Sequence, residues 1–145
     1  MQISANGGTI VLDYYPIKGW DNVIQSNKHL RILTFKGETQ MNRAIVNKND
    51  WSNSNTNVEY NSFTDCSTVV LHRTAIATYD HNTLALKLNT GGWHSNTTKS
   101  RLNAILDQVM YGARVYQKAF DWYLSYNNQT VDFWDGMILV NGDVV

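Results

Sequence analysis

Two cations close to the predicted start of a helix are the side chains that point most directly to chemistry in this sequence. Lys99 and Arg101 lie in or near the first turn of a helix predicted over about residues 97–110. The positive end of the helix dipole lies there, so each cation costs roughly 0.3–1 kcal/mol where an acidic residue would stabilise the helix. Free backbone N–H groups and cations at a helix start bind anions, most naturally phosphate. The pattern therefore predicts a phosphate site between Gly92 and Asn103.

The neighbouring side chains suggest how such a site would hold its ligand. Trp93 would stack on a base, while Lys99 and Arg101 would neutralise phosphate charge. Hydrogen bonds to the ligand would come from Thr97, Thr98 and Asn103. Two structural alternatives stay open: Arg101 pairs with an aspartate across the sheet or stacks on Trp93, and Trp93 closes the end of the core over the helix.

One pair of histidines suggests catalysis. His72-Arg73-Thr74 and His81-Asn82-Thr83 both match a His-x-Thr pattern. Twin copies of such a pattern flank one phosphate in a class of phosphoesterases, but that class keeps its copies in separate halves of the chain. The alternative is two surface histidines near turns. We rank a phosphoesterase that uses His72 and His81 as the last of the functions considered.

Other catalytic and metal-binding patterns are missing from the sequence. The four histidines lack metal-ligand spacing, and no GxSxG, P-loop or GxGxxG pattern occurs. Cys66 is the only cysteine and has no histidine close to it in the sequence. We therefore expect a protein that is not an enzyme and that carries no metal and no cofactor.

Composition narrows the class of partner. The 145 residues include 12 basic and 12 acidic side chains, a balance that argues against a nucleic-acid coat protein that works by bulk charge. Charged residues make up 17%, below the roughly 25% that is usual, and there are five Trp and eight Tyr. This composition fits a surface buried against another copy or a partner, and equally an aromatic-rich core. We expect neither a membrane span nor a secretory signal.

The elements that must position the predicted site follow one another in the sequence. Thr83–Leu88 reads as a strand, and Gly91 with Gly92 ends it in a turn. The oxygens of Asn96, Thr97 and Thr98 are candidates to cap the helix. A buried stripe at helical spacing follows, and Gly112 ends the helix; the stripe consists of Leu102, Ile105, Leu106, Val109 and Met110.

The N-terminal part is less regular. Two segments read as strands, Thr9–Tyr15 and Leu30–Lys36, and Trp20–Gln25 reads as a short helical turn. Glu38–Lys48 fits a short helix or an irregular strand, because Met41, Ala44 and Ile45 have helical spacing. Asn49–Asp65 is rich in Asn and Ser, which predicts a long loop with a β-bulge near Val58–Tyr60.

Short strands dominate the rest of the chain. They are predicted at Thr68–His72, Ala75–Tyr79, Arg114–Lys118, Trp122–Tyr126, Val131–Trp134 and Met137–Val140. Most are joined by short turns, so we expect antiparallel pairing with the helix packed on one face. The prediction is a single α+β domain over residues 1–145, with an antiparallel sheet and one principal amphipathic helix.

Part of the sequence resembles a family of small uncharacterised proteins of tailed bacteriophages. The resemblance rests on Gly92, Trp93, Thr97, Thr98, Lys99, Arg101, Leu102 and Asn103, and on two flanking runs at Val69–Ala77 and Val115–Leu124. It covers roughly Ser67–Leu139, within a motif-bearing part at 67–140, and Ser95 stands where the pattern has Thr. The resemblance implies a phage origin and expression inside a bacterium, and it implies no activity.

These observations give two main hypotheses. In the first, the chain is a non-enzymatic phage accessory protein that binds a nucleotide or nucleic acid at Gly92–Asn103. In the second, it is a protein-interaction module: an inhibitor of a host defence or host enzyme, or a minor virion or assembly component. Both place it in the host cytoplasm, with the virion as the other location, and both leave room for a homo-oligomer.

Overall fold

The computed structural model describes residues 28–145, and side chains from Gly37 onward. The chain divides into two units, Met1–Lys36 and Gly37–Val145, and the first is described only where a helix begins. The strand predicted at Thr9–Tyr15 and the turn predicted at Trp20–Gln25 lie outside the described residues. The account that follows concerns the second unit.

The described chain contains two helices, α1 (Lys28–Val46) and α2 (Asn96–Val109). The strand predicted at Leu30–Lys36 is wrong, because this segment belongs to α1. A glycine in a helix costs roughly 1 kcal/mol but does not end it, so α1 continues through Gly37. The helical spacing of Met41, Ala44 and Ile45 is confirmed, and all three side chains are buried.

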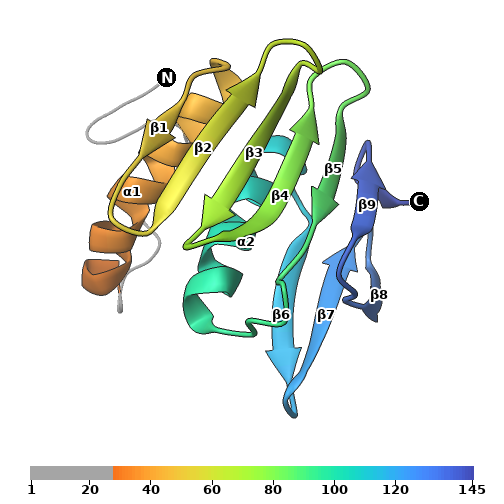
Figure 1. Cartoon of the computed structure of the whole chain (residues 1–145). Coiled ribbons are helices and arrows are strands. Elements are labelled where there is room, and N and C mark those ends of the chain that lie inside the picture. Colours follow the sequence, from red (N-terminus) through yellow and green to blue (C-terminus); the bar gives the residue numbers. More distant parts are fainter. Residues whose placement is uncertain (1–27) are drawn as a thin grey trace. The chain divides into compact units, whose positions relative to one another are not determined.

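A large antiparallel sheet runs in the order β1-β2-β3-β4-β5-β9-β10 (Figure 1). Its last two strands come from the C-terminal end of the chain, and β9 pairs with β5. The strands are β1 (Trp51–Ser52), β2 (Thr56–Asn61), β3 (Cys66–Leu71), β4 (Thr74–Asp80), β5 (Ala85–Leu88), β9 (Met137–Val140) and β10 (Asp143–Val144).

The long loop predicted at Asn49–Asp65 is wrong, because it contains β1 and β2. Asn and Glu are poor strand formers and obscured the alternation, yet Thr56 and Val58 point into the core and Glu59 points out. The irregularity expected near Val58–Tyr60 lies instead in the β3–β4 pairing, between Val69 and Val70.

Three strands form a second sheet rather than extending the first. They are β6 (Arg114–Lys118), β7 (Asp121–Tyr126) and β8 (Gln129–Asp132), in that order. The predicted hairpin between the first two is confirmed, with Gln117 opposite Trp122. The expectation of a single sheet is corrected here, although the α+β class is confirmed.

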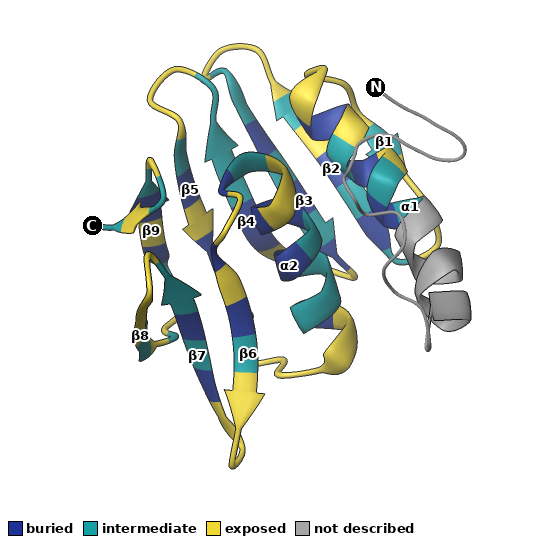
Figure 2. Ribbon diagram, turned by 180° about the vertical axis from the view of Figure 1, so that it is seen from behind, coloured by how far each residue is buried: buried dark blue, intermediate teal, exposed yellow. Residues whose placement is uncertain are grey.

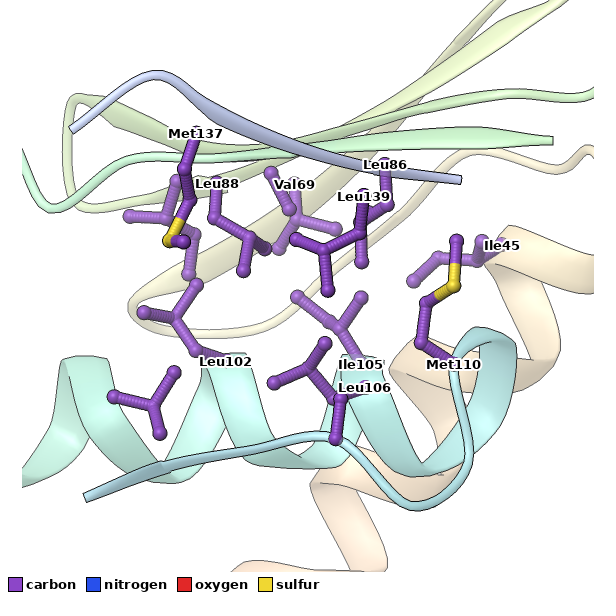
Figure 3. Packing of buried hydrophobic residues seen from close by; sticks show 14 of the residues in the cluster. Ile45, Val69, Leu86, Leu88, Leu102, Ile105, Leu106, Met110, Met137 and Leu139 are labelled. Atoms are coloured by element: carbon purple, nitrogen blue, oxygen red, sulfur yellow. The ribbon is translucent and has the colours of Figure 1, made fainter. Parts of the chain in front are cut away.

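The core lies between the large sheet and the helices. Figure 2 shows the buried face of α2 turned toward the strands. The predicted stripe of α2 is confirmed at Leu102, Ile105 and Leu106, which are fully buried, and Figure 3 shows them opposite Leu86, Leu88 and Leu139. Burying a Leu or Ile side chain contributes roughly 1.5–3 kcal/mol, so this layer holds α2 in place against the sheet.

Candidate binding site at the start of helix α2

The turn before α2 is tied to the loop before β9. Thr90 is buried, and its amide and hydroxyl both donate to Asp135 Oδ1, at 2.7 and 2.8 Å. Gly91 has a φ of +64°, and a Cβ there would lie 2.5 Å from Thr74 Cγ2. The turn predicted at Gly91 and Gly92 is therefore held at a defined position, and only glycine fits at 91.

Ser95 caps α2, in place of the three residues predicted to do so. Its Oγ accepts the amide of Thr98 at 3.1 Å, and its carbonyl accepts the amide of Lys99. The expected caps were Asn96, Thr97 and Thr98, but these already belong to the helix. Within residues 37–145 no partner is found for the amides of Asn96 and Thr97, so two N–H groups at the positive end remain open.

Arg101 is engaged inside the protein. Its Nη1 lies 3.0 Å from Glu38 Oε2 in α1, its Nε donates to Thr56 Oγ1, and Nη2 reaches Asn55 Oδ1 at 3.4 Å. The side chains of the ion pair are 12% and 4% exposed. The structural alternative of an ion pair therefore describes Arg101, with a glutamate of α1 as the partner and not an aspartate of the sheet or Trp93.

Thr98 and Asn103 also have partners within the fold. Both are buried, and Thr98 Oγ1 lies 3.0 Å from Ser95 Oγ. The Asn103 amide group donates to the carbonyl of Val115 at 2.9 Å and accepts its N–H at 2.8 Å. Asn103 thereby holds β6 against α2. These contacts occupy the groups that were expected to reach a ligand.

Lys99 has a different environment. Its Nζ donates to Gln117 Oε1 at 3.2 Å and lies 5.7 Å from the centre of the Trp122 ring. Neither ion pair found within residues 37–145 includes Lys99. The side chain is half-buried, and among residues 37–145 this cation in the first turn of α2 has no carboxylate partner.

Aromatic side chains gather next to this lysine, around the buried Trp122. We call His94 and Phe133, together with their chain neighbours Trp93 and Trp134, the aromatic surface. The His94 and Phe133 rings lie 4.9 and 5.9 Å from that of Trp122. Trp93 is 69% exposed and Trp134 47%, so Trp93 does not close the core. Trp122 Nε1 is buried and has no hydrogen-bond partner among residues 37–145. Sequence reasoning noted the tryptophans but missed His94 and Phe133, which only the tertiary fold brings here.

The two His-x-Thr copies are not brought together. His72 lies in the turn before β4 and His81 directly after it, so seven strand residues, roughly 20 Å, separate them. His81 Nε2 lies 2.8 Å from Ser67 Oγ, between the rings of Tyr60 and Tyr79. Burial lowers the pKa of His81 below its usual 6.5, against the opposing effect of the Asp65 carboxylate.

The described residues offer no alternative metal or membrane feature. No group of three or more His, Cys, Asp or Glu side chains among them could hold a metal ion. No helix in residues 28–145 combines the length and the apolar character that crossing a bilayer requires. A shallow hollow of about 450 Å³ contains none of the predicted site residues; it is lined by Glu59, Tyr60, Asn61, Ser62, Phe63 and Thr68.

The fold and the side chains around Lys99 thus define an α+β protein with an exposed aromatic surface near the start of α2. A family model described as Kyanoviridae Gp96 protein matches residues 34–140, and the chain belongs to this family of phage proteins. The match confirms the phage family and extends the resemblance upstream of Ser67, while the Gly-Trp motif itself stays untested. No curated protein and no solved structure matches the chain.

Proposed function

We propose that this protein is a non-enzymatic phage accessory protein that binds a nucleotide or a single-stranded nucleic acid beside the start of α2. The observation that carries the proposal is Lys99, which has no carboxylate partner within residues 37–145. It lies in the first turn of α2, where the amides of Asn96 and Thr97 are also open within this range, and the exposed Trp93 precedes this turn in the sequence. The ligand residues of the proposal are Trp93, Thr97 and Lys99. Arg101, Thr98 and Asn103 hold the helix in place and are not ligand residues in this proposal.

Charge and shape both support this ligand class. A helix N-terminus with open amides and a nearby cation attracts a phosphate oxygen. Exposed aromatic faces accept any base, because every base has a π-face. Trp93 and Trp134 are exposed in two loops that the hydrogen bond from Thr90 to Asp135 ties together, so both aromatic faces are available to a base.

Binding of a fluorescein-labelled oligothymidylate tests the proposal, with thymidine monophosphate as competitor. We expect Trp93→Ala to weaken binding by roughly 5- to 100-fold, the effect of one lost stacking contact. Lys99→Gln should weaken binding and lower the slope of log affinity against log salt by about one.

The matched control is Lys118→Gln, because Lys118 is an exposed lysine at the end of β6. It should leave both the affinity and the salt slope nearly unchanged. Absence of binding at about 1 mM, the weak end of recognition, would refute the proposal. So would equal effects of Lys99→Gln and Lys118→Gln.

A second candidate, a protein-interaction module, is favoured by the β6–β7 turn. Ala119 and Phe120 have φ of 52° and 72°, and Phe120 is 91% exposed. Such turns favour Asn and Gly, because most other residues cost roughly 1–2 kcal/mol in this region. The next turn meets the same demand with Asn127 and Asn128. A strained turn that presents a phenyl ring to solvent is typical of a partner contact.

Photo-cross-linking in infected host cells separates this candidate from nucleotide binding. A photoreactive phenylalanine at position 120 should give one discrete protein adduct, and the same group at position 111 should not. Tyr111 is a fair control because it is an aromatic residue that is 90% exposed. Equal labelling at both positions, or no adduct at 120, contradicts the interaction module.

A further inference from the structure

We infer that the uncovered face of the large sheet is a docking surface for a second copy of this chain, in a twofold dimer. The part of α1 within the described unit and α2 lie on one face of the sheet (Figures 1 and 2). No described element of residues 37–145 covers the other face. This surface is separate from the start of α2 and does not depend on the proposed function.

The uncovered face is flat and carries few charges. Its side chains alternate with those of the core and are partly or fully exposed. Most are small or β-branched, and the central ones are Asn57, Thr68, Val70, Ala75, Thr78 and Ile138. A surface of this kind packs face to face with another sheet at a separation of about 10 Å.

One row of side chains gives the face a charge pattern that matches itself. In the strand register, Glu59 lies opposite Thr68, Thr68 opposite Thr78, and Thr78 opposite Lys87. The acid and the base are both exposed and lie three strand spacings apart, roughly 14 Å. Neither forms an ion pair with another residue in the range 37–145.

A twofold axis parallel to the strands, between β3 and β4, makes use of this pattern. Such an axis exchanges β2 with β5 across the interface, so Glu59 of each copy faces Lys87 of the other. The two contacts are equivalent by symmetry, which is the property of an isologous interface. The side chains between the two charges are uncharged. The charge pattern of this face is therefore complementary to the same face of a second copy.

The other charged groups near this face do not oppose the arrangement. Asp80 ends β4, and its Oδ1 accepts the amides of Asn82 and Thr83, which turns the carboxylate into the following turn. Arg73 lies at the opposite end of β4, in the β3–β4 turn. Both lie at the rim, where charge is compatible with an interface.

Association by this face is favoured over association by a sheet edge. The two edge strands, β1 and β10, contain only two residues each, a length that limits strand addition. The face spans roughly 20 Å by 17 Å over five strands, ~350 Å² of flat area, which is below the ~800 Å² per partner of a standard interface. A dimer with micromolar dissociation is therefore expected.

Sedimentation equilibrium of the full chain, and of variants in which the two interface charges are reversed, tests the dimer. Between about 1 and 200 μM, a range that brackets micromolar dissociation, the protein should pass from monomer to dimer. Glu59→Lys and Lys87→Glu should each weaken dimerisation on the order of tenfold or more, because each places two like-charged pairs across the interface.

The double variant Glu59→Lys/Lys87→Glu restores both opposite-charge contacts and should recover the dimer. Circular dichroism must show the same fold for all variants, and recovery in the double variant excludes misfolding as the cause. Lys118→Glu is the control, because it makes the same charge change on β6. A protein that stays monomeric at 200 μM overturns the inference, and so does a dimer that both single variants leave unchanged.

Discussion

Arg101 and Lys99 are two residues apart on one helix, and the fold gives them opposite roles. Two residues turn a helix by roughly 200°, so the side chains leave on different sides. Arg101 points to α1 and β2, where Glu38 pairs with it in a buried network. Lys99 points to β6 and β7, where it meets an amide oxygen and an indole face and no carboxylate of the described residues.

The difference shows that a cation at a helix start is not by itself a sign of a ligand. The helix dipole acts more strongly on Lys99, in the first turn, than on Arg101, in the next turn, and the charge of Arg101 is paired with Glu38 within the fold. The criterion for a candidate ligand residue is therefore the absence of an internal carboxylate partner among the described residues, and the variants below test this distinction between the two residues.

The largest effect is expected for Arg101→Met. It leaves the Glu38 carboxylate buried with only the Ser100 hydroxyl as a hydrogen-bond donor, and breaking a buried pair in this way costs about 3–5 kcal/mol. The free energy of unfolding, measured in urea, should fall by that amount. Glu38→Met/Arg101→Met should recover most of the loss, since it removes both charges. A loss below about 1 kcal/mol in the single variant would return Arg101 to the candidate ligand residues.

Asn103→Ala should cost about 2–3 kcal/mol, because both backbone groups of Val115 lose their buried partner. The control is Asn42→Ala, since Asn42 makes one hydrogen bond to the carbonyl of Ala104 in a part-buried position. It should cost roughly 1 kcal/mol. Equal losses in urea unfolding for the two variants would show that Asn103 does not hold β6 against α2.

Ser95→Ala should lower the free energy of unfolding by about 1 kcal/mol, the usual effect of a lost N-cap. Ser95→Asp should retain the cap and also place an acid at the positive end of the dipole. Asn96→Ala separates the observed cap from the one predicted by the sequence and should have little effect on thermal unfolding. A larger loss for Asn96→Ala than for Ser95→Ala would reverse the assignment.

The local patterns of the sequence were sufficient for α2 and for the short hairpins. Leu102, Ile105 and Leu106 have helical spacing and are fully buried, and the strands around residues 114–126 pair as the turn predicts. Local signals of this kind depend on neighbours in the chain. The helix start was therefore predicted to within a few residues, although its capping residue was not.

Contacts between distant segments could not be predicted in the same way. Glu38 precedes Arg101 by 63 residues and lay in a segment that fitted either a helix or a strand. The pairing of Leu88 with Met137 returns β9 to the large sheet, and no turn signal encodes it. The partners of Arg101 and the aromatic surface next to Lys99 both depend on such long-range contacts, which is why the sequence could not show which of the predicted site residues already have partners inside the protein.

The smallest effect on stability is expected for Lys99→Gln. The variant loses a cation–π contact of about 0.5–1 kcal/mol at an exposed site, and it removes a cation that costs roughly 0.3–1 kcal/mol at the helix start. The two contributions nearly cancel, so urea unfolding should change by less than about 0.5 kcal/mol. Arg101→Met, two positions away, should differ from it by several kcal/mol. A loss above about 1 kcal/mol in Lys99→Gln would give Lys99 a structural role like that of Arg101, and the proposed ligand site would then lack its available cation.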